Sequence, residues 1–299
     1  MTALWVAAAL IASAAQTARN ATQASLTRAI GTVGATQVRF LFGLPFALLF
    51  LLLVRSFGGE AIPALTPRAL GFTTLGALAQ IGATALMLLT MKQRSFAVTT
   101  AWIKTEPVLV ALIAALVLGD PLTWTALLAI AIATAGVLLM SVNPGAGVAM
   151  WREAGPALTG LLAGALFGAS AIGFRGGITS LETGGFLIRA TTTLAVSLVL
   201  QTAILLVWLA LFDRAALRAS FRVWRSSLGA GFLGAFASQF WFIGFSLTSA
   251  ANIRTLALVE VIFAQAVSRF VFRQAVSKRQ LLGMTVIMLG VGLLLRNQT

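Results

Sequence analysis

The chain has 299 residues, of which 59% are hydrophobic and only 9% are charged, whereas a typical soluble domain has about 25% charged residues. Its 21 Lys and Arg outweigh seven acids and give a formal net charge of +14. Most basic residues lie in short connectors between apolar segments, which is typical of a membrane topology signal and excludes a basic nucleic-acid-binding face. With no Cys and no His, disulfides and the commonest metal ligand are excluded, and neither a metal nor another cofactor is expected.

Ten apolar segments approach the roughly 20 mostly apolar residues that a membrane helix needs. They are 2–20, 32–54, 68–91, 96–118, 122–142, 156–176, 185–212, 228–248, 253–272 and 279–296. No Lys or Arg precedes the first segment, so we expect a membrane helix there and not a signal peptide. The stretch 213–225 carries four arginines and is predicted to lie along the membrane interface.

An internal repeat organises these segments. Glu106 and Glu260 lie 154 residues apart, and the same offset pairs Gly136 with Gly290. Two five-helix halves, 1–147 and 148–299, are therefore predicted within one membrane domain. Because five is odd, halves that fold alike must enter the bilayer in opposite orientations. The predicted fold class is an all-α integral membrane protein with ten transmembrane helices as two inverted five-helix repeats.

Charge in the connectors predicts the orientation. The odd-numbered connectors hold most of the Lys and Arg residues, which places them in the cytoplasm and both termini outside. A multi-pass protein of a bacterial-type inner (plasma) membrane is the expectation.

The densest polar cluster in any segment is Trp102-Ile-Lys104-Thr-Glu106-Pro107. Pro107 tends to open or kink a helix, while Trp102 and Glu106, four residues apart, share a face. An ionisable residue inside a membrane indicates a functional site, so Trp102, Lys104 and Glu106 are predicted to contact a substrate. The alternative is that Lys104 extends to the interface and Glu106 bonds a neighbouring helix.

Other polar and aromatic residues in the segments are further candidates. The predicted substrate contacts also include Gln16, Gln80, Thr84, Phe167, Ser170, Gln239 and Trp241. Such stripes are more often packing faces, but a buried amide in lipid needs a partner. Pro107, Arg39, Arg189 and Glu260 are assigned a structural or coupling role. Arg39 and Arg189 occupy matching places near the starts of the second and seventh helices, which favours interface anchoring, and Glu260 has no proline beside it. The stripe of glycines at 160, 164 and 168 predicts close helix packing.

Several motifs resemble one transporter family. Glu106-Pro107 opening the fourth segment, Gly-Asp-Pro-Leu-Thr at 119–123, Gly136, Glu260 and Gly290 are similar to the drug/metabolite transporter superfamily, of the EamA type. The resemblance implies a cavity between two four-helix lobes, formed by helices 1, 3, 4, 6, 8 and 9. In several relatives both termini face the cytoplasm, the reverse of the charge count. In plan, the chain is similar to amino acid exporters, including the YddG aromatic amino acid exporters.

These features predict a secondary transporter that exports small metabolites, foremost amino acids, by alternating access through a central cavity between the two repeats. Lys104 would face a carboxylate, Glu106 an ammonium group, and Trp102, Phe167 or Trp241 an apolar side chain. A proton is the expected coupling ion if Glu106 titrates, and a monomer is expected. The alternatives are a multidrug exporter of cationic compounds, a membrane-embedded enzyme, disfavoured without His, Cys or paired acids, and a channel, disfavoured without a ring of similar groups.

Overall fold

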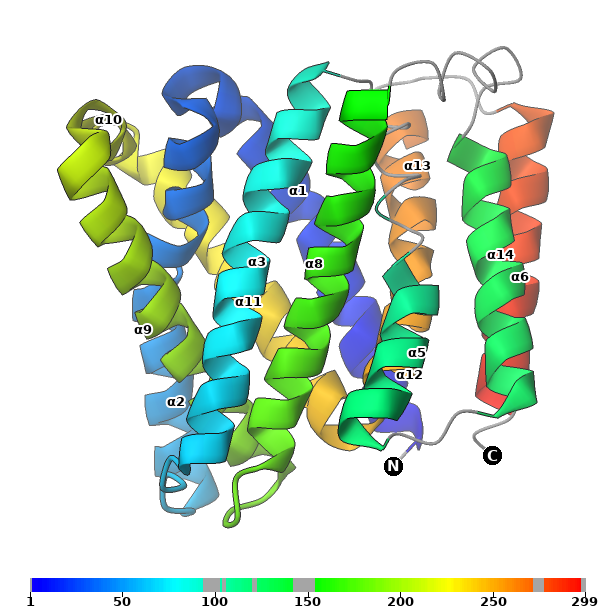
Figure 1. Cartoon of the computed structure of the whole chain (residues 1–299), viewed down its shortest axis with the longest axis horizontal. Helices are drawn as coiled ribbons and strands as arrows, with labels where there is room; N and C mark the ends of the chain where they lie inside the picture. The colour runs from blue at the N-terminus through cyan, green and yellow to red at the C-terminus, as the bar shows by residue number, and fades with distance from the viewer. Residues whose placement is uncertain are drawn as a thin grey trace. The chain divides into compact units, whose positions relative to one another are not determined.

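The computed structural model describes residues 2–93, 103, 106–119, 123–141, 154–270 and 277–296, which form helices joined by short turns, with no strand among them (Figure 1). The helices are α1 (Thr2–Leu41), α2 (Leu44–Gly58), α3 (Pro67–Gln93), α5 (Glu106–Leu118), α6 (Trp124–Ser141), α8 (Ala154–Thr179), α9 (Phe186–Phe212), α10 (Arg214–Arg222), α11 (Trp224–Leu247), α12 (Ala250–Leu256), α13 (Glu260–Phe270) and α14 (Lys278–Arg296). Within the described ranges, five helices are long and apolar enough to cross a membrane, and a sixth apolar helix is shorter. The predicted all-α membrane fold is confirmed.

Contacts divide the chain into two compact units. The first combines Ala3–Ile81 with Gly173–Thr248, and the second combines Gly82–Ile172 with Ser249–Thr299. Each unit therefore takes helices from both halves of the sequence, and α3 and α8 each contribute a segment to both. The predicted repeat boundary at 147/148 stays a prediction. The two units are described separately below.

The first helix of unit 1 is longer than the predicted segment 2–20. Residues 21–30 contain neither Gly nor Pro, so the helix continues until Gly31, whose φ of 76° and ψ of 176° break it. Gln23 Nε2 donates a hydrogen bond to Ala35 O at 3.0 Å, although residues twelve apart would lie about 18 Å apart along a straight helix. The chain therefore folds back on itself at Gly31.

The second predicted segment, 32–54, is interrupted at Phe42 and Gly43. The helix restarts as α2 at Leu44, with Pro45 in its first turn, because proline lacks the N–H that a continuous helix would use. In unit 1, α2 packs against α9 and α11, where the Phe46 and Phe232 rings meet edge to face, 5.1 Å between centroids.

Two close contacts join helices in unit 1. The backbones of α3 and α8 approach closely, since a Cβ atom on Gly173 would lie 2.7 Å from Gly76 Cα. Arg175 Nη1 on α8 donates to Phe245 O (2.8 Å) and Thr248 O (2.5 Å), satisfying carbonyls that a helix C-terminus leaves unpaired. These contacts join α3, α8 and α11.

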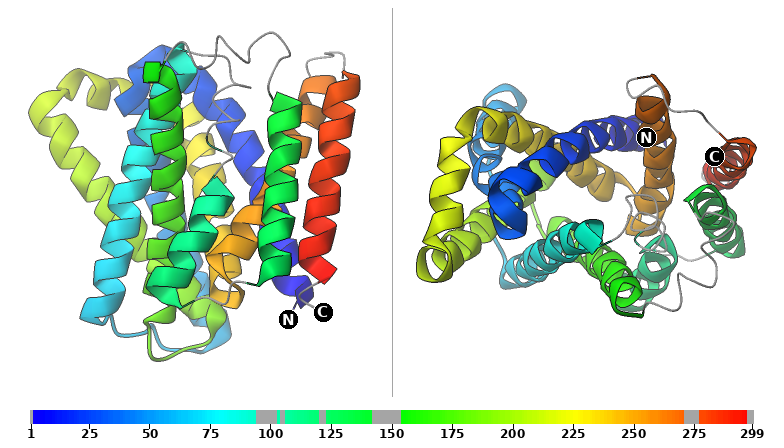
Figure 2. Two further views of the ribbon diagram at one scale, coloured as in Figure 1. Left: turned by 45° about the vertical axis from the view of Figure 1, so that its right-hand side comes forward. Right: turned by 90° about the horizontal axis from the view of Figure 1, so that it is seen from above.

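The arginine-rich stretch 213–225 contains the short helix α10, which links α9 to α11 (Figure 2). Asp213 caps this helix by accepting a hydrogen bond from Ala216 N at 3.0 Å, the interaction expected of an N-cap aspartate. Its placement along the membrane interface stays a prediction.

In unit 2, α6 and α14 lie side by side and antiparallel (Figure 1). A Cβ atom on Gly136 would lie 2.7 Å from Ile287 N, and one on Gly290 would lie 2.5 Å from Ala133 N. Residue numbers rise along one helix as they fall along the other. Gly136 and Gly290 are equivalent positions in the two halves, 154 residues apart, and so are Ala133 and Ile287. We call such pairs repeat mates. The two halves thus present the same surface to each other in opposite directions, which is the packing that inverted repeats require.

The ninth segment, predicted as one helix over 253–272, is interrupted. α12 ends at Leu256, a 3₁₀ turn spans Ala257–Val259, and α13 begins at Glu260. Thr255 Oγ1 donates to Ala251 O at 2.8 Å, and such back-bonding by threonine commonly bends a helix. The sequence predicted one segment over 253–272 and did not identify this 3₁₀ turn.

Candidate functional site

Glu106 is a buried acid in unit 2. It lies in the first turn of α5, where the helix dipole favours a negative charge, and Pro107 follows it at a position that proline tolerates. The residue is 1% exposed. Gly168 on α8 packs beside it, since a Cβ atom there would lie 3.7 Å from Glu106 Cγ. A Cβ atom at Gly168 would therefore be in ordinary van der Waals contact with the Glu106 side chain.

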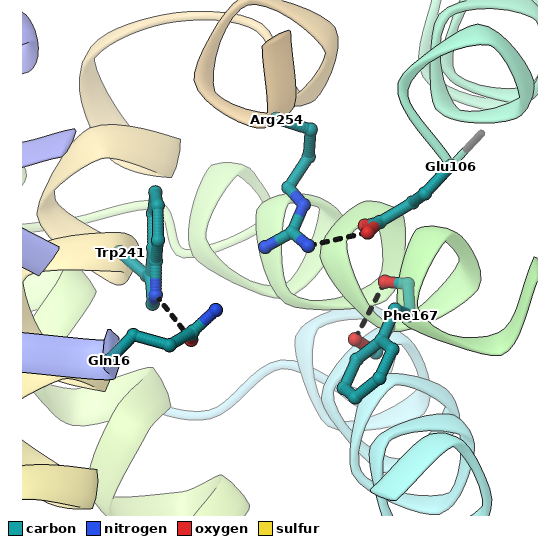
Figure 3. A network of polar contacts seen from close by, with 6 residues as sticks. Gln16, Glu106, Phe167, Trp241 and Arg254 are labelled. Carbon is teal, nitrogen blue, oxygen red and sulfur yellow. Dashed lines mark hydrogen bonds and ion pairs between the residues drawn. The ribbon is translucent and has the colours of Figure 1, made fainter. Parts of the chain in front are cut away.

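Arg254 on α12 is the counter-ion of Glu106. Its Nη2 donates to Glu106 Oε2 at 2.5 Å, and the arginine side chain is only 11% exposed (Figure 3). A charge inside apolar helices is costly unless it is paired. Sequence reasoning did not select Arg254 as a site residue. The sequence did contain a signal for Arg254. At the 154-residue offset of the repeat, Arg254 corresponds to Thr100, so one half carries a cation where the other does not.

The two carboxylate oxygens of Glu106 differ in their hydrogen bonding. Glu106 Oε1 is buried and has no hydrogen-bond partner among the residues that the structure describes. Trp102 and Lys104, predicted to complete this cluster, lie outside the described residues. The site therefore contains an ion pair with one acceptor atom unused by the described part of the chain.

The sixth-segment candidates make contacts within α8. Ser170 Oγ donates to Phe167 O at 2.9 Å (Figure 3), a bond inside its own helix. A Cβ atom on Gly164 would lie 3.0 Å from Ile103 O, and one on Gly168 would lie 3.0 Å from Val110 Cγ2. Close helix packing is therefore confirmed at these two glycines.

Two further candidates in unit 2 are buried. Thr84 on α3 is fully buried, and Glu260, in the first turn of α13, is 7% exposed. Glu106 and Glu260 thus occupy matching places in the two halves, each in the first turn of a helix. A substrate role for Thr84 and a structural or coupling role for Glu260 stay predictions.

In unit 1 the structure brings Gln16 and Trp241 together. Trp241 Nε1 on α11 donates to Gln16 Oε1 on α1 at 3.0 Å (Figure 3), and the indole is only 5% exposed. A buried indole N–H needs such a partner. The two residues are 225 positions apart, so sequence alone could nominate each of them but not the pair.

Gln80 and Gln239 both bond to α9. Gln239 Nε2 donates to Thr191 Oγ1 at 2.7 Å, and Gln201 Nε2 donates to Gln80 Oε1 at 2.8 Å. Gln239 and Trp241 lie two residues apart on α11, about 200° around the helix, so they face different neighbours. Sequence reasoning missed Thr191 and Gln201, whose polar side chains lie within an otherwise apolar segment.

Arg39 and Arg189, which occupy matching places in the two halves, make contacts inside unit 1. Arg39 is 5% exposed, and its guanidinium carbon lies 5.2 Å from the centre of the Phe40 ring. Arg189 Nη1 donates to Leu181 O at 3.4 Å. These contacts are compatible with a structural role, and a coupling role stays a prediction.

Long apolar helices enclosing an acid, an arginine and several amides define a multi-pass membrane protein with a polar interior. The chain belongs to the EamA-like transporter family, whose model matches residues 3–142 and 155–296. No curated protein matches the sequence significantly. A solved structure described as "Crystal structure of protein" is similar with a TM-score of 0.72 over 98% of this chain and 96% of that one, at 15% sequence identity. That similarity supports the fold.

Proposed function

We propose that this protein is a secondary transporter that exports small metabolites, with amino acids, aromatic ones included, as the leading class. The observation that carries the proposal is the Glu106–Arg254 ion pair, buried among apolar helices. Ionisable residues at such depth commonly mark substrate or ion pathways. The acid comes from one half of the sequence and the base from the other. Alternating access between the two repeats is the proposed transport mechanism.

Residue roles follow from these contacts. Glu106 is proposed to bind the ammonium group of the substrate, and Trp102 or Phe167 its apolar part. A proton is the proposed coupling ion. A monomer in a bacterial-type plasma membrane completes the proposal.

Counterflow in vesicles tests this function. Proteoliposomes containing the purified protein are loaded with each unlabelled amino acid, and entry of the labelled compound is followed. We expect saturable counterflow with wild-type protein and its loss with Glu106→Gln. Glu182→Gln, the same chemical change at an exposed acid in a connector, is the matched control and should retain transport.

Three outcomes would contradict parts of the proposal. Counterflow by the Glu106→Gln variant at the wild-type rate would remove the role of Glu106. Non-saturable flux without counterflow would indicate a channel. Recovery of a chemically altered label would indicate an enzyme.

A further inference from the structure

The short helix α10 lies at one end of two long apolar helices. It joins the end of α9 to the start of α11, and all three helices belong to unit 1 (Figure 1). Both α9 and α11 are long and apolar enough to cross a membrane. A short helix that connects two membrane-spanning helices at their ends lies at a membrane surface, where lipid headgroups are its nearest neighbours.

Arginines cover the side of α10 that faces away from the rest of unit 1. Arg214, Arg218 and Arg222 are spaced by four residues and therefore share one side of the helix. All three are exposed, whereas Ser220, about 200° around the helix from Arg218, is fully buried. Arg225, in the first turn of α11, is also exposed. We call these four arginines the arginine stripe.

The charge of the arginine stripe is not balanced by a carboxylate in the described part of the chain. None of its four members forms an ion pair with a residue that the structure describes. The neighbouring acid, Asp213, caps α10. Arg214 Nε donates to Ala210 O at 2.7 Å, and the Arg225 guanidinium carbon lies 5.5 Å from the centre of the Trp224 ring. The stripe is therefore open to anions from outside the described chain.

Exposed aromatic side chains flank the arginine stripe. Phe212 is 72% exposed, Phe221 is 53% exposed and Trp224 is 51% exposed. Aromatic rings are enriched at the level of the lipid headgroups, where they contact both acyl chains and polar groups. A free phosphate ion would match the arginines but would leave these rings in water. Arginines and rings together at the ends of two apolar helices therefore favour an anionic lipid as the partner.

Contacts with the rest of unit 1 hold the arginine stripe in place. The Phe221 ring lies 5.8 Å from the Phe42 ring between centroids, and Ser227 Oγ on α11 donates to Ser220 O at 3.3 Å. A surface that is already ordered by such contacts binds a ligand without the entropy cost of ordering a loop.

We propose that the arginine stripe is a binding surface for the phosphate groups of anionic phospholipids. Each guanidinium can bind phosphate oxygens through two parallel N–H groups. Arg214 and Arg222 are about 12 Å apart along the helix axis, too far for one phosphate group, so the stripe binds more than one headgroup. It distinguishes phosphatidylglycerol from phosphatidylcholine, because the choline group neutralises its own phosphate. This inference goes beyond the proposed transport function and does not depend on it.

Competition between two lipids tests the proposal. The purified protein in detergent is mixed with equal amounts of phosphatidylglycerol and phosphatidylcholine that have the same acyl chains, and bound lipids are counted by native mass spectrometry. For wild-type protein we expect about fivefold more bound phosphatidylglycerol, as expected for arginines at an anionic surface. Arg218→Gln combined with Arg222→Gln should bring the ratio close to one. The matched control, Arg55→Gln combined with Arg68→Gln, removes the same charge from exposed positions on α2 and α3 and should leave the ratio unchanged.

A second measurement locates the bound lipid without changing an arginine. Phosphatidylglycerol brominated near the carbonyl end of its acyl chains should quench the fluorescence of Trp224, obtained as the difference between wild-type protein and Trp224→Phe. Brominated phosphatidylcholine should quench this signal less.

Three results would overturn the inference. They are equal binding of the two lipids by wild-type protein, equal lipid ratios in the two double variants, and equal quenching of Trp224 by the two brominated lipids. Complete displacement of phosphatidylglycerol by inorganic phosphate would also overturn it, because it would indicate a general anion site. None of these results involves counterflow, so the proposed function would stand.

Discussion

Gly290 on α14 lies against Ala133 on α6 so closely that a Cβ atom on the glycine would come within 2.5 Å of the alanine nitrogen. Gly136 and Ile287, which are the repeat mates of Gly290 and Ala133, make the equivalent contact. Real Cβ atoms do not approach backbone atoms at this distance, so the two helices depend on glycine at both places. The contact also gives the antiparallel arrangement of two halves that sequence spacing could only suggest.

We therefore predict that Gly290→Ala destabilises unit 2. The new methyl group must push α14 away from α6, and overpacking of this kind typically costs about 1–3 kcal/mol. The midpoint of thermal unfolding in detergent should fall. Gly292→Ala is the control, because a Cβ atom there meets nothing within 4 Å. Equal midpoints for the two variants would contradict the close contact.

Trp241→Phe should weaken unit 1 by removing the indole donor to Gln16. Loss of a typical intramolecular hydrogen bond costs about 0.5–1.5 kcal/mol. Trp224→Phe is the matched control, because Trp224 is 51% exposed. Differential scanning fluorimetry of both variants checks the prediction, which would be wrong if Trp224→Phe were the more destabilising change.

Arg175→Met should loosen the end of α11. The change keeps most of the side-chain length but removes the donor to Phe245 O and Thr248 O, at a cost of about 2 kcal/mol. Hydrogen exchange should accelerate in the last turn of α11. Arg218→Met, at an exposed position on α10, should leave that exchange unchanged, and similar rates in both variants would contradict the capping role of Arg175.

Gly31→Ala should be destabilising for a conformational reason alone. A Cβ atom at Gly31 meets nothing within 4 Å, but φ of 76° with ψ of 176° belongs to a region that only glycine adopts easily, at a cost of about 1–3 kcal/mol for other residues. Gly71→Ala also meets open space and lies in a regular helix, so it should be neutral or stabilising. Thermal unfolding of the two variants distinguishes these effects, and a neutral Gly31→Ala would show that the turn tolerates another conformation.

Apolar length and repeat spacing were sufficient to predict much of the fold. Hydrophobic segments overlap the helices because backbone groups in lipid must be satisfied within the helix, and this requirement depends on local composition. The breaks at Gly43 and before Glu260 were missed. They arise from a tight turn and from threonine back-bonding, which leave no strong mark in hydropathy.

The candidate site was predictable one residue at a time but not as contacts. Glu106 was identified because an acid in an apolar segment is rare, and this rule needs no knowledge of its neighbours. Arg254 was missed because its partner lies 148 positions away in the sequence. Likewise, the sequence identified Gln239 and Trp241 as candidates without their partners, and helical geometry directs them to α9 and α1.

The ion pair has a consequence for how such a chain can evolve. The position in the first half that corresponds to Arg254 is Thr100, so only one half of the sequence carries this arginine. A dimer of two identical five-helix subunits would carry either two such arginines or none, because one codon would specify both. Joining the halves in a single polypeptide separates those codons. A one-sided charge pair is thus available only to the fused, 299-residue form, while Gly136 and Gly290 keep the symmetry of the simpler assembly.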